Sequence, residues 1–159
     1  MKIAETILML LVGMQAVSPP RTYPISVSIS TPAETVKSGE EIRVNVRVTN
    51  TSNHVVKILK SSGNEGPADG VNSADVTYDG GQRAPRIPNH QIFLTRGLIS
   101  VKPGDSKEDF LIVSKLFDMS KPGRYTVLVR HELLEDDGTD DKFKRSFVPS
   151  NSISITVTP

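Results

Sequence analysis

The sequence predicts an all-β protein folded as one antiparallel sandwich of about seven to nine strands. Runs in which apolar and polar residues alternate recur along the chain, and clusters of Gly, Pro, Asn and Asp separate them. No heptad or internal repeat is present, and aromatic residues make up only 5% of a chain without Trp. We therefore expect a core of Val, Ile and Leu, a composition that suits sheets.

Two strands are clearest near the start of the chain. Residues Ile25 to Ser30 and Ile42 to Thr49 alternate apolar with polar side chains, which is typical of strands with one buried face. The polar turn Asn50 to Asn53 contains an N-glycosylation triplet, a pattern that polar turns often meet by chance. The next strand, His54 to Lys60, is predicted to pair with the strand before the turn as an antiparallel hairpin.

The middle of the chain has weaker signals. Ala74 to Tyr78 is a short predicted strand, and Asp79-Gly80-Gly81 after it is a strong hairpin signal. The connection Gln82 to His90 holds prolines and cannot be a central strand. Because the apolar patches Ile92 to Leu94 and Leu98 to Val101 have no assigned partners, the strand count remains a range.

The stretch Ser100 to Leu133 organises the predicted fold. Pro103-Gly104-Asp105 has turn chemistry, and Phe110 to Val113 is a short apolar strand. One helical turn is predicted over Leu116 to Met119, and Pro122-Gly123 ends it. From that point apolar and polar residues alternate in a long sheet strand.

Tyr125 lies at the start of this long strand, just after the turn at Gly123. This placement predicts the tyrosine corner of immunoglobulin-like sandwiches, in which a buried Tyr returns its hydroxyl to upstream backbone. The alternative is a core Tyr at a strand start. After an acidic loop, Glu135 to Asp141, the chain passes through Pro149 into a closing strand, Ile153 to Val157.

The N-terminus has the layout of a secretory signal peptide. Lys2 precedes an apolar run, Ile7 to Met14, which is too short to span a bilayer. We expect residues 1–18 to be the signal peptide and residues 19–159 to be the domain, exported to the periplasm or the extracellular space. The alternative is a buried N-terminal helix. In the exported form we expect no membrane span.

Composition restricts the partners. The formal net charge is +1, from 19 Lys plus Arg against 18 Asp plus Glu, so no overall field attracts nucleic acid or an acidic membrane. The chain has no cysteine. Disulfides, thiol lipid anchors and thiol nucleophiles are therefore excluded, and the composition fits a bacterial exported protein.

Three segments of the sequence resemble known domains: Val101 to Asp105, Phe117 to Val127 and Ser150 to Val157. They resemble the closing half of small bacterial immunoglobulin-like domains. Similar stretches occur in the accessory β-domain of deuterolysin-like secreted metallopeptidases and, more loosely, in the intracellular proteinase inhibitor family. The resemblance implies an immunoglobulin-like fold. This chain departs from these families because it has no metallopeptidase module and lacks the Trp residues of the inhibitors.

The sequence predicts no enzyme, metal centre or cofactor site. His54, His90 and His131 are the only histidines, and none has the spacing of a paired metal ligand. A metal site or a dispersed active site would need the fold to bring all three together. The chain also has no G-x-S-x-G nucleophile elbow.

Loops at one end of the sandwich are the predicted contact surface, because recognition residues concentrate on loops of rigid scaffolds. The candidate contact loops are the Asn50 to Asn53 turn, the Gln82 to His90 connection and the Glu135 to Asp141 loop. The candidate binding residues in the last two are Arg83, Arg86, Asp136, Asp137 and Asp140. That loop offers oxygen ligands for calcium, and its alternative is a solvated hairpin tip.

Further basic residues could join Arg83 and Arg86 in a patch if the fold made them converge; these are Arg96, Lys142, Lys144 and Arg145. The sequence thus predicts a non-enzymatic exported module that binds a protein or a cell-envelope component. The alternative is a proteinase inhibitor that presents one loop to a protease cleft.

Overall fold

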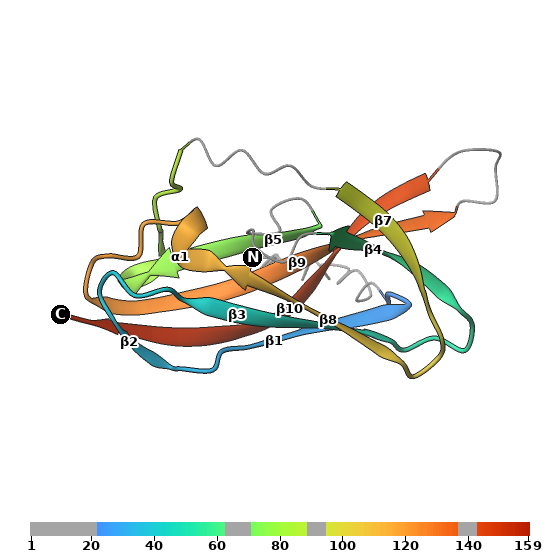
Figure 1. Cartoon of the computed structure of the whole chain (residues 1–159), viewed down its shortest axis with the longest axis horizontal. Coiled ribbons are helices and arrows are strands. Elements are labelled where there is room, and N and C mark those ends of the chain that lie inside the picture. The colour runs from blue at the N-terminus through green and yellow to red at the C-terminus, as the bar shows by residue number, and fades with distance from the viewer. Residues whose placement is uncertain (1–21, 63–70, 89–94, 137–142) are drawn as a thin grey trace, which may run out of the picture.

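A computed structural model describes residues 22–62, 71–88, 95–136 and 143–159, without the side chains at 61–62, 95–96, 136 and 143 (Figure 1). The predicted all-β, immunoglobulin-like antiparallel sandwich is confirmed. In chain order the elements are β1 (Ile25–Ser30), β2 (Thr35–Lys37), β3 (Arg43–Asn50), β4 (Val56–Ser62), β5 (Asn72–Tyr78), the 3-10 turn η1 (Asp79–Gly81), β6 (Gln82–Arg83), β7 (Thr95–Val101), β8 (Ser106–Ile112), α1 (Val113–Leu116), β9 (Gly123–Asp136) and β10 (Phe143–Thr158).

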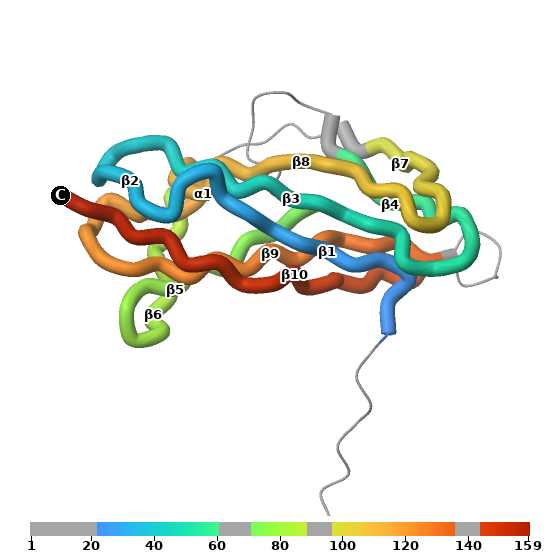
Figure 2. Tube along the Cα trace, turned by 90° about the horizontal axis from the view of Figure 1, so that it is seen from below, coloured from blue at the N-terminus to red at the C-terminus, as the bar shows by residue number. Residues whose placement is uncertain are grey.

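Two main layers form the sandwich. The three-stranded sheet has the order β1-β3-β8, and the five-stranded sheet has the order β2-β10-β9-β5-β6. Figure 2 shows these layers from the side, with β8 and β3 above β9 and β10. The pairs are antiparallel except for β2 with β10, and β4 pairs with β7 in a separate ribbon. The described residues hold ten strands, and β2 and β6 are too short for alternation to reveal them.

The core lies between the two sheets and consists mainly of aliphatic side chains. Alternation produces it, because each strand turns every second side chain inward. Val44, Val127 and Ile155 are examples with 0% exposure. Each such side chain stabilises the fold by about 1.5–3 kcal/mol relative to leaving it in water.

The two ends of the sandwich differ and are named here. The pocket end holds residues 37–41, 79–88 and 113–124, and the hairpin end holds residues 50–60, 97–105, 131–136 and 143–148. Figures 1 and 2 place β2, α1 and the C-terminus at the pocket end and the β4–β7 ribbon at the opposite end.

The tyrosine corner closes the pocket end. The Tyr125 hydroxyl donates to the carbonyl oxygen of Lys121 at 2.8 Å, which is the hydrogen bond that such a corner requires. The Tyr78 hydroxyl donates to the carbonyl oxygen of Pro122, also at 2.8 Å. The two rings pack with centroids 5.0 Å apart. The turn before β9 is therefore held by two hydroxyls and by two rings packed at an interplanar angle of 57°.

Gly123 is required at this turn for two reasons. Its φ is +148°, a conformation that residues with a side chain rarely adopt. A Cβ at this position would lie 2.5 Å from a ring carbon of Tyr78, closer than van der Waals contact allows. Glycine is thus the residue that lets the Tyr78 ring lie against the start of β9.

At the hairpin end, the predicted hairpin between β3 and β4 is wrong. Both edges of β3 are already occupied, by β1 on one side and β8 on the other, so β4 pairs with β7. Asn50 holds the turn that redirects the chain: its Nδ2 donates to the carbonyl oxygens of His54 and Val101 at 2.7 and 2.8 Å. The Asn50 side chain is 1% exposed, and the nitrogen that glycosylation requires is engaged in both bonds.

A bulge in β10 joins the two main sheets. Pro149 has no backbone N–H, and the β9–β10 register shifts between Pro149 and Ser152. The freed Asn151 side chain reaches β1, where its Oδ1 accepts from the Ile29 N–H at 2.8 Å and its Nδ2 donates to the Ile29 carbonyl at 3.1 Å. Both backbone polar groups of one edge-strand residue are thereby satisfied.

Three polar side chains are linked by hydrogen bonds in the interior beside the hairpin end. Asn72 Nδ2 donates to Asp109 Oδ2 at 3.2 Å, so Asn72 Oδ1 is left to accept from His131 Nδ1 at 2.8 Å. His131 is 2% exposed, and burial lowers its pKa to about 4. The imidazole is therefore neutral at pH 7, with its proton on Nδ1.

Candidate functional site

A pocket of about 610 Å³ opens at the pocket end. Three segments that are far apart in the sequence form its walls, and they are 39–41, 85–88 and 114–120. The turn after β2 supplies the first wall, the connection after β6 the second, and α1 with the loop after it the third. The pocket therefore exists only in the folded chain.

The connection at 85–88 is held in place by backbone contacts. The Ile87 N–H donates to the Leu116 carbonyl at 2.9 Å, and the Asp118 N–H donates to the Pro85 carbonyl at 2.8 Å. Arg86 forms an isolated antiparallel bridge with Phe117 between these bonds. The prolines limit this segment to extended backbone, so the wall is fixed before any partner arrives.

The floor of the pocket is apolar. Phe117 and Met119 line it and are nearly buried, with 5% and 4% exposure. Ile87 stands at the rim and is 38% exposed, which is unusual for a large aliphatic side chain in this structure. The floor therefore offers an apolar contact surface that a partner can cover.

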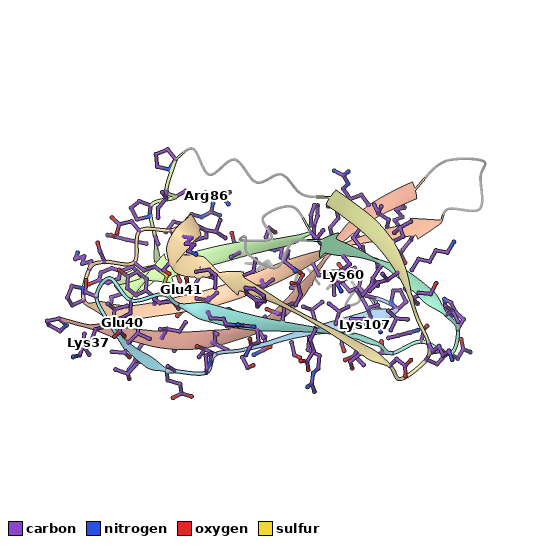
Figure 3. The ribbon with its side chains drawn as sticks, in the orientation of Figure 1. Lys37, Glu40, Glu41, Lys60, Arg86 and Lys107 are labelled. Atoms are coloured by element: carbon purple, nitrogen blue, oxygen red, sulfur yellow. The ribbon has the colours of Figure 1, made fainter. Side chains whose placement is uncertain are left out.

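Arg86 is stacked within this site. Its guanidinium carbon lies 5.3 Å from the centroid of the Phe117 ring, a cation–π arrangement. Figure 3 shows Arg86 at the same end of the molecule as Glu40 and Glu41. The stack fixes the long side chain and reduces the entropy that binding must overcome.

Carboxylates line the opposite walls. Glu41 pairs with Lys115 at 3.1 Å, whereas Glu40 accepts a hydrogen bond from the backbone N–H of Lys37 at 2.9 Å. Asp118 accepts from the hydroxyl and N–H of Ser120 at 2.6 and 3.1 Å, and these bonds lower its pKa. Within the described residues neither Glu40 nor Asp118 forms an ion pair.

The serine hydroxyls of the pocket are engaged in hydrogen bonds of the fold. The lining residues include serine hydroxyls and one lysine, Lys115, whose ammonium pairs with Glu41. The Ser120 hydroxyl donates within its own turn, and the Ser114 hydroxyl accepts from the Ile42 N–H at 2.9 Å. Across residues 22–62, 71–88, 95–136 and 143–159, no three His, Asp or Glu side chains lie close enough to share a metal ion.

The predicted binding residues are not brought together. Arg86 lines the pocket, while Arg83 is exposed on the outer face of β6. Asp136 ends β9 at the opposite end, where it is the register partner of Phe143. Asp137 and Asp140 lie outside the described residues, so the calcium prediction for the acidic loop stays a prediction. The predicted end loops thus fall at both ends of the sandwich.

The predicted basic patch does not form as one surface from the residues described. Arg145 belongs to the hairpin end, where its Nε lies 2.7 Å from Oε1 of the buried Glu132. Lys144 is exposed there, as register partner of Glu135. Lys142 and the Arg96 side chain lie outside the described part of the chain. Strand register therefore separates cations that the sequence places near each other.

The two histidines that the structure describes lie in different environments. His54 is exposed in the turn that follows β3, and His131 is buried between the sheets. His90 lies outside the described residues. Burial of His131 was foreseeable, because it continues the inward series of Tyr125, Val127 and Val129 along β9.

The remaining pocket residues had no sequence signal. Glu40 comes from the turn after β2, whereas Phe117 and Asp118 come from the loop after α1, and only the packed chain brings these walls together. Ile87 beside Pro88 was recognisable as an apolar residue in a loop that cannot form a central strand, which is the one signal that pointed to this end.

Comparison with known proteins gave structural likenesses only. No protein-family model matches the chain, and no curated protein matches it. The CARDB domain of the PF1109 protein from Pyrococcus furiosus, described in complex with di-metal ions, is 13% identical with a TM-score of 0.42, over 84% of this chain and 87% of that chain. The sporulation control protein Spo0M from Bacillus subtilis is 13% identical with a TM-score of 0.37, over 81% and 50%.

A β-glucosidase from Erythrobacter marinus is 9% identical with a TM-score of 0.38, and the match spans 80% of this chain but 15% of the glucosidase. All three TM-scores lie below 0.5, so these likenesses carry no argument about function. Similarity to deuterolysin-like accessory domains and to the proteinase inhibitors stays a prediction. In the described part of the chain, no helix is long and apolar enough to cross a bilayer.

Proposed function

We propose that this protein is a non-enzymatic, exported immunoglobulin-like module that binds a protein or a cell-envelope component through its pocket end. One observation carries the proposal: the pocket of about 610 Å³ combines an apolar floor with a stacked Arg86 and two carboxylates outside ion pairs. Apolar contact supplies affinity at such a site, and the charges select the partner.

The pocket is built to be present before binding. Its 85–88 wall is fixed by the two backbone hydrogen bonds, and the neighbouring turn is fixed by Tyr125 and Tyr78. A preformed site loses little conformational entropy when it binds, which favours recognition by a small surface. Export is supported by the sequence alone, through the apolar run Ile7 to Met14 behind Lys2.

A matched capture experiment tests the proposal. The immobilised protein is exposed to extracytoplasmic proteins and envelope fragments of its host, alongside an Ile87→Asp variant and a Leu98→Asp control. Leu98 is 48% exposed at the hairpin end, so its variant adds the same charge far from the pocket. We expect one dominant partner on the unmodified protein and on Leu98→Asp, and its loss on Ile87→Asp. Equal capture by all three proteins, or by none, would contradict the proposal.

The proteinase inhibitor stays the alternative prediction, and no feature of the described residues favours it over the binding module. Mixing the protein with proteases at equal molar amounts tests it directly. An inhibitor slows a protease and survives uncut, whereas the proposed module does neither.

A further inference from the structure

The outer face of the five-stranded sheet carries three cations in a regular arrangement. Residues that are direct partners across strands share a face. Register places Arg83 opposite Thr77, and Thr77 opposite Thr126 on β9. Two residues before Thr126, Arg124 points to the same outer face because side chains repeat every second residue.

The arrangement continues across the other half of the sheet. Arg124 is opposite Thr156 on β10, and Thr156 is opposite Thr35 on β2. Lys37 follows two residues after Thr35, toward the pocket end. Arg83, Arg124 and Lys37 therefore form a diagonal, called here the cationic line, in which each step crosses two strands and advances two residues. Standard sheet spacings make each step about 12 Å between Cα atoms.

The cationic line is exposed and not neutralised. All three side chains are exposed, and within the described residues no carboxylate pairs with any of them. The carboxylate of Asp79 approaches only the backbone N–H of Arg124, at 3.3 Å. Nearer the hairpin end, the same face behaves differently, because Arg130 pairs with Asp75 and Arg145 pairs with Glu132.

Hydroxyl side chains lie between the cations. Thr77 and Thr126 stand between Arg83 and Arg124, and Thr156 stands between Arg124 and Lys37. In the described structure these three threonine hydroxyls have no hydrogen-bond partner on other residues. The spaces between the cations are therefore occupied by threonine hydroxyl groups, which can donate and accept hydrogen bonds.

We propose that the cationic line binds an extended acidic polysaccharide. Carboxylates of the polymer would pair with the Arg83 and Arg124 guanidinium groups and the Lys37 ammonium, since arginine forks match carboxylates. Sugar hydroxyls would bond to the threonines between them. Nucleic acid fits less well, because single strands bind on stacking aromatic side chains and the described residues along the line include none. This surface is separate from the pocket, and the inference does not rest on it.

Polygalacturonate is the probe, with neutral dextran and single-stranded DNA for comparison. The test variant combines Arg83→Gln, Arg124→Gln and Lys37→Gln. The control removes the same charge elsewhere, through Lys57→Gln, Lys60→Gln and Lys107→Gln, all exposed lysines away from the line. Figure 3 shows Lys37 at the pocket end and Lys60 and Lys107 toward the other end. Thermal unfolding establishes that both variants are folded.

Calorimetry at low and physiological salt measures the affinities. We expect the unmodified protein to bind polygalacturonate and not dextran, the test variant to lose about tenfold or more in affinity, and the control to stay within about twofold. Three results overturn the inference: no binding of polygalacturonate, an equal loss in both variants, or tighter binding of DNA than of polygalacturonate. An equal loss in both variants would indicate that net charge alone attracts the polysaccharide.

Discussion

The two ends of the sandwich are held by different kinds of polar group. At the pocket end, neutral tyrosine hydroxyls donate to backbone carbonyls and a glycine admits a ring against the chain. At the hairpin end, the buried groups are the Asn50 amide, the His131 imidazole and the Glu132 carboxylate. The pocket end therefore depends on shape, whereas the hairpin end depends on protonation. A preformed binding site is better placed at the end whose geometry does not depend on a buried imidazole.

The largest expected effect comes from a substitution that disrupts the packing of Tyr78 against Gly123 at the pocket end. In Gly123→Ala the added methyl meets the Tyr78 ring, and the positive φ is strained as well. We expect a loss of about 3 kcal/mol or more in the free energy of unfolding, measured with urea.

Gly39→Ala is the matched control. Gly39 has a φ of +87° but no atom within 4 Å of an added Cβ, so only backbone strain of about 1–2 kcal/mol applies. Equal losses in the two variants would show that contact with Tyr78 does not hold the turn.

The second effect belongs to the hairpin end and appears on acidification. Unfolding raises the pKa of His131 from about 4 to its ordinary value of 6.5, so between these pH values the unfolded chain binds a proton that the folded chain does not. The contribution of the neutral His131 imidazole to the free energy of unfolding is fully present above pH 6.5 and is lost as the pH falls to about 4. We expect His131 to account for about 3 kcal/mol of lost unfolding free energy between pH 7.5 and 4.

Denaturation curves at several pH values isolate this contribution. Acidification protonates carboxylates as well as imidazoles, so the measured quantity is the difference in pH dependence between the unmodified protein and His131→Gln. His54→Gln is the matched control, because it makes the same substitution at an exposed histidine. If His131→Gln keeps the full dependence, burial of a neutral imidazole is not its cause.

A smaller loss of stability is expected when the Tyr125 hydroxyl is removed from the pocket end. Tyr125→Phe keeps the ring in the core but leaves the Lys121 carbonyl without its donor, at a cost of about 1–2 kcal/mol in unfolding free energy. Tyr23→Phe is the control, because the Tyr23 ring packs against the core and its hydroxyl has no partner among the described residues. Thermal unfolding that ranks Tyr23→Phe as the more destabilised variant would contradict the corner.

The smallest effect concerns the exposed Arg130–Asp75 pair on the outer face. Both side chains are well solvated, with relative exposures of 44% and 39%, so Asp75→Asn should lower stability by no more than about 0.5 kcal/mol. A loss above about 1 kcal/mol in urea unfolding would mean that surface pairs also hold this sheet.

The sequence predicted what depends on neighbouring residues. Alternation located β1, β3 and β9, and the position of Tyr125 behind Gly123 predicted the corner. It could not predict features that depend on which strands become neighbours. The partner of β4 depends on both edges of β3 being occupied.

The same limit applies to the candidate sites. The Arg86 stack joins residues 31 positions apart along the chain, on Phe117. The cationic line depends on the register of four strand pairs, which no local pattern contains. Residue types were visible in the sequence, but the distances between them were set by pairing.

Amide hydrogen exchange along β9, followed by NMR at pH 7.5 and 4.5, tests most directly whether the pocket end is held independently of the hairpin end. Protection factors remove the intrinsic pH dependence of exchange. Because global unfolding limits protection everywhere along β9, we predict that amides near His131 lose at least about tenfold in protection at pH 4.5 and that amides near Tyr125 lose clearly less. Equal losses at both positions, or none at either, would contradict it.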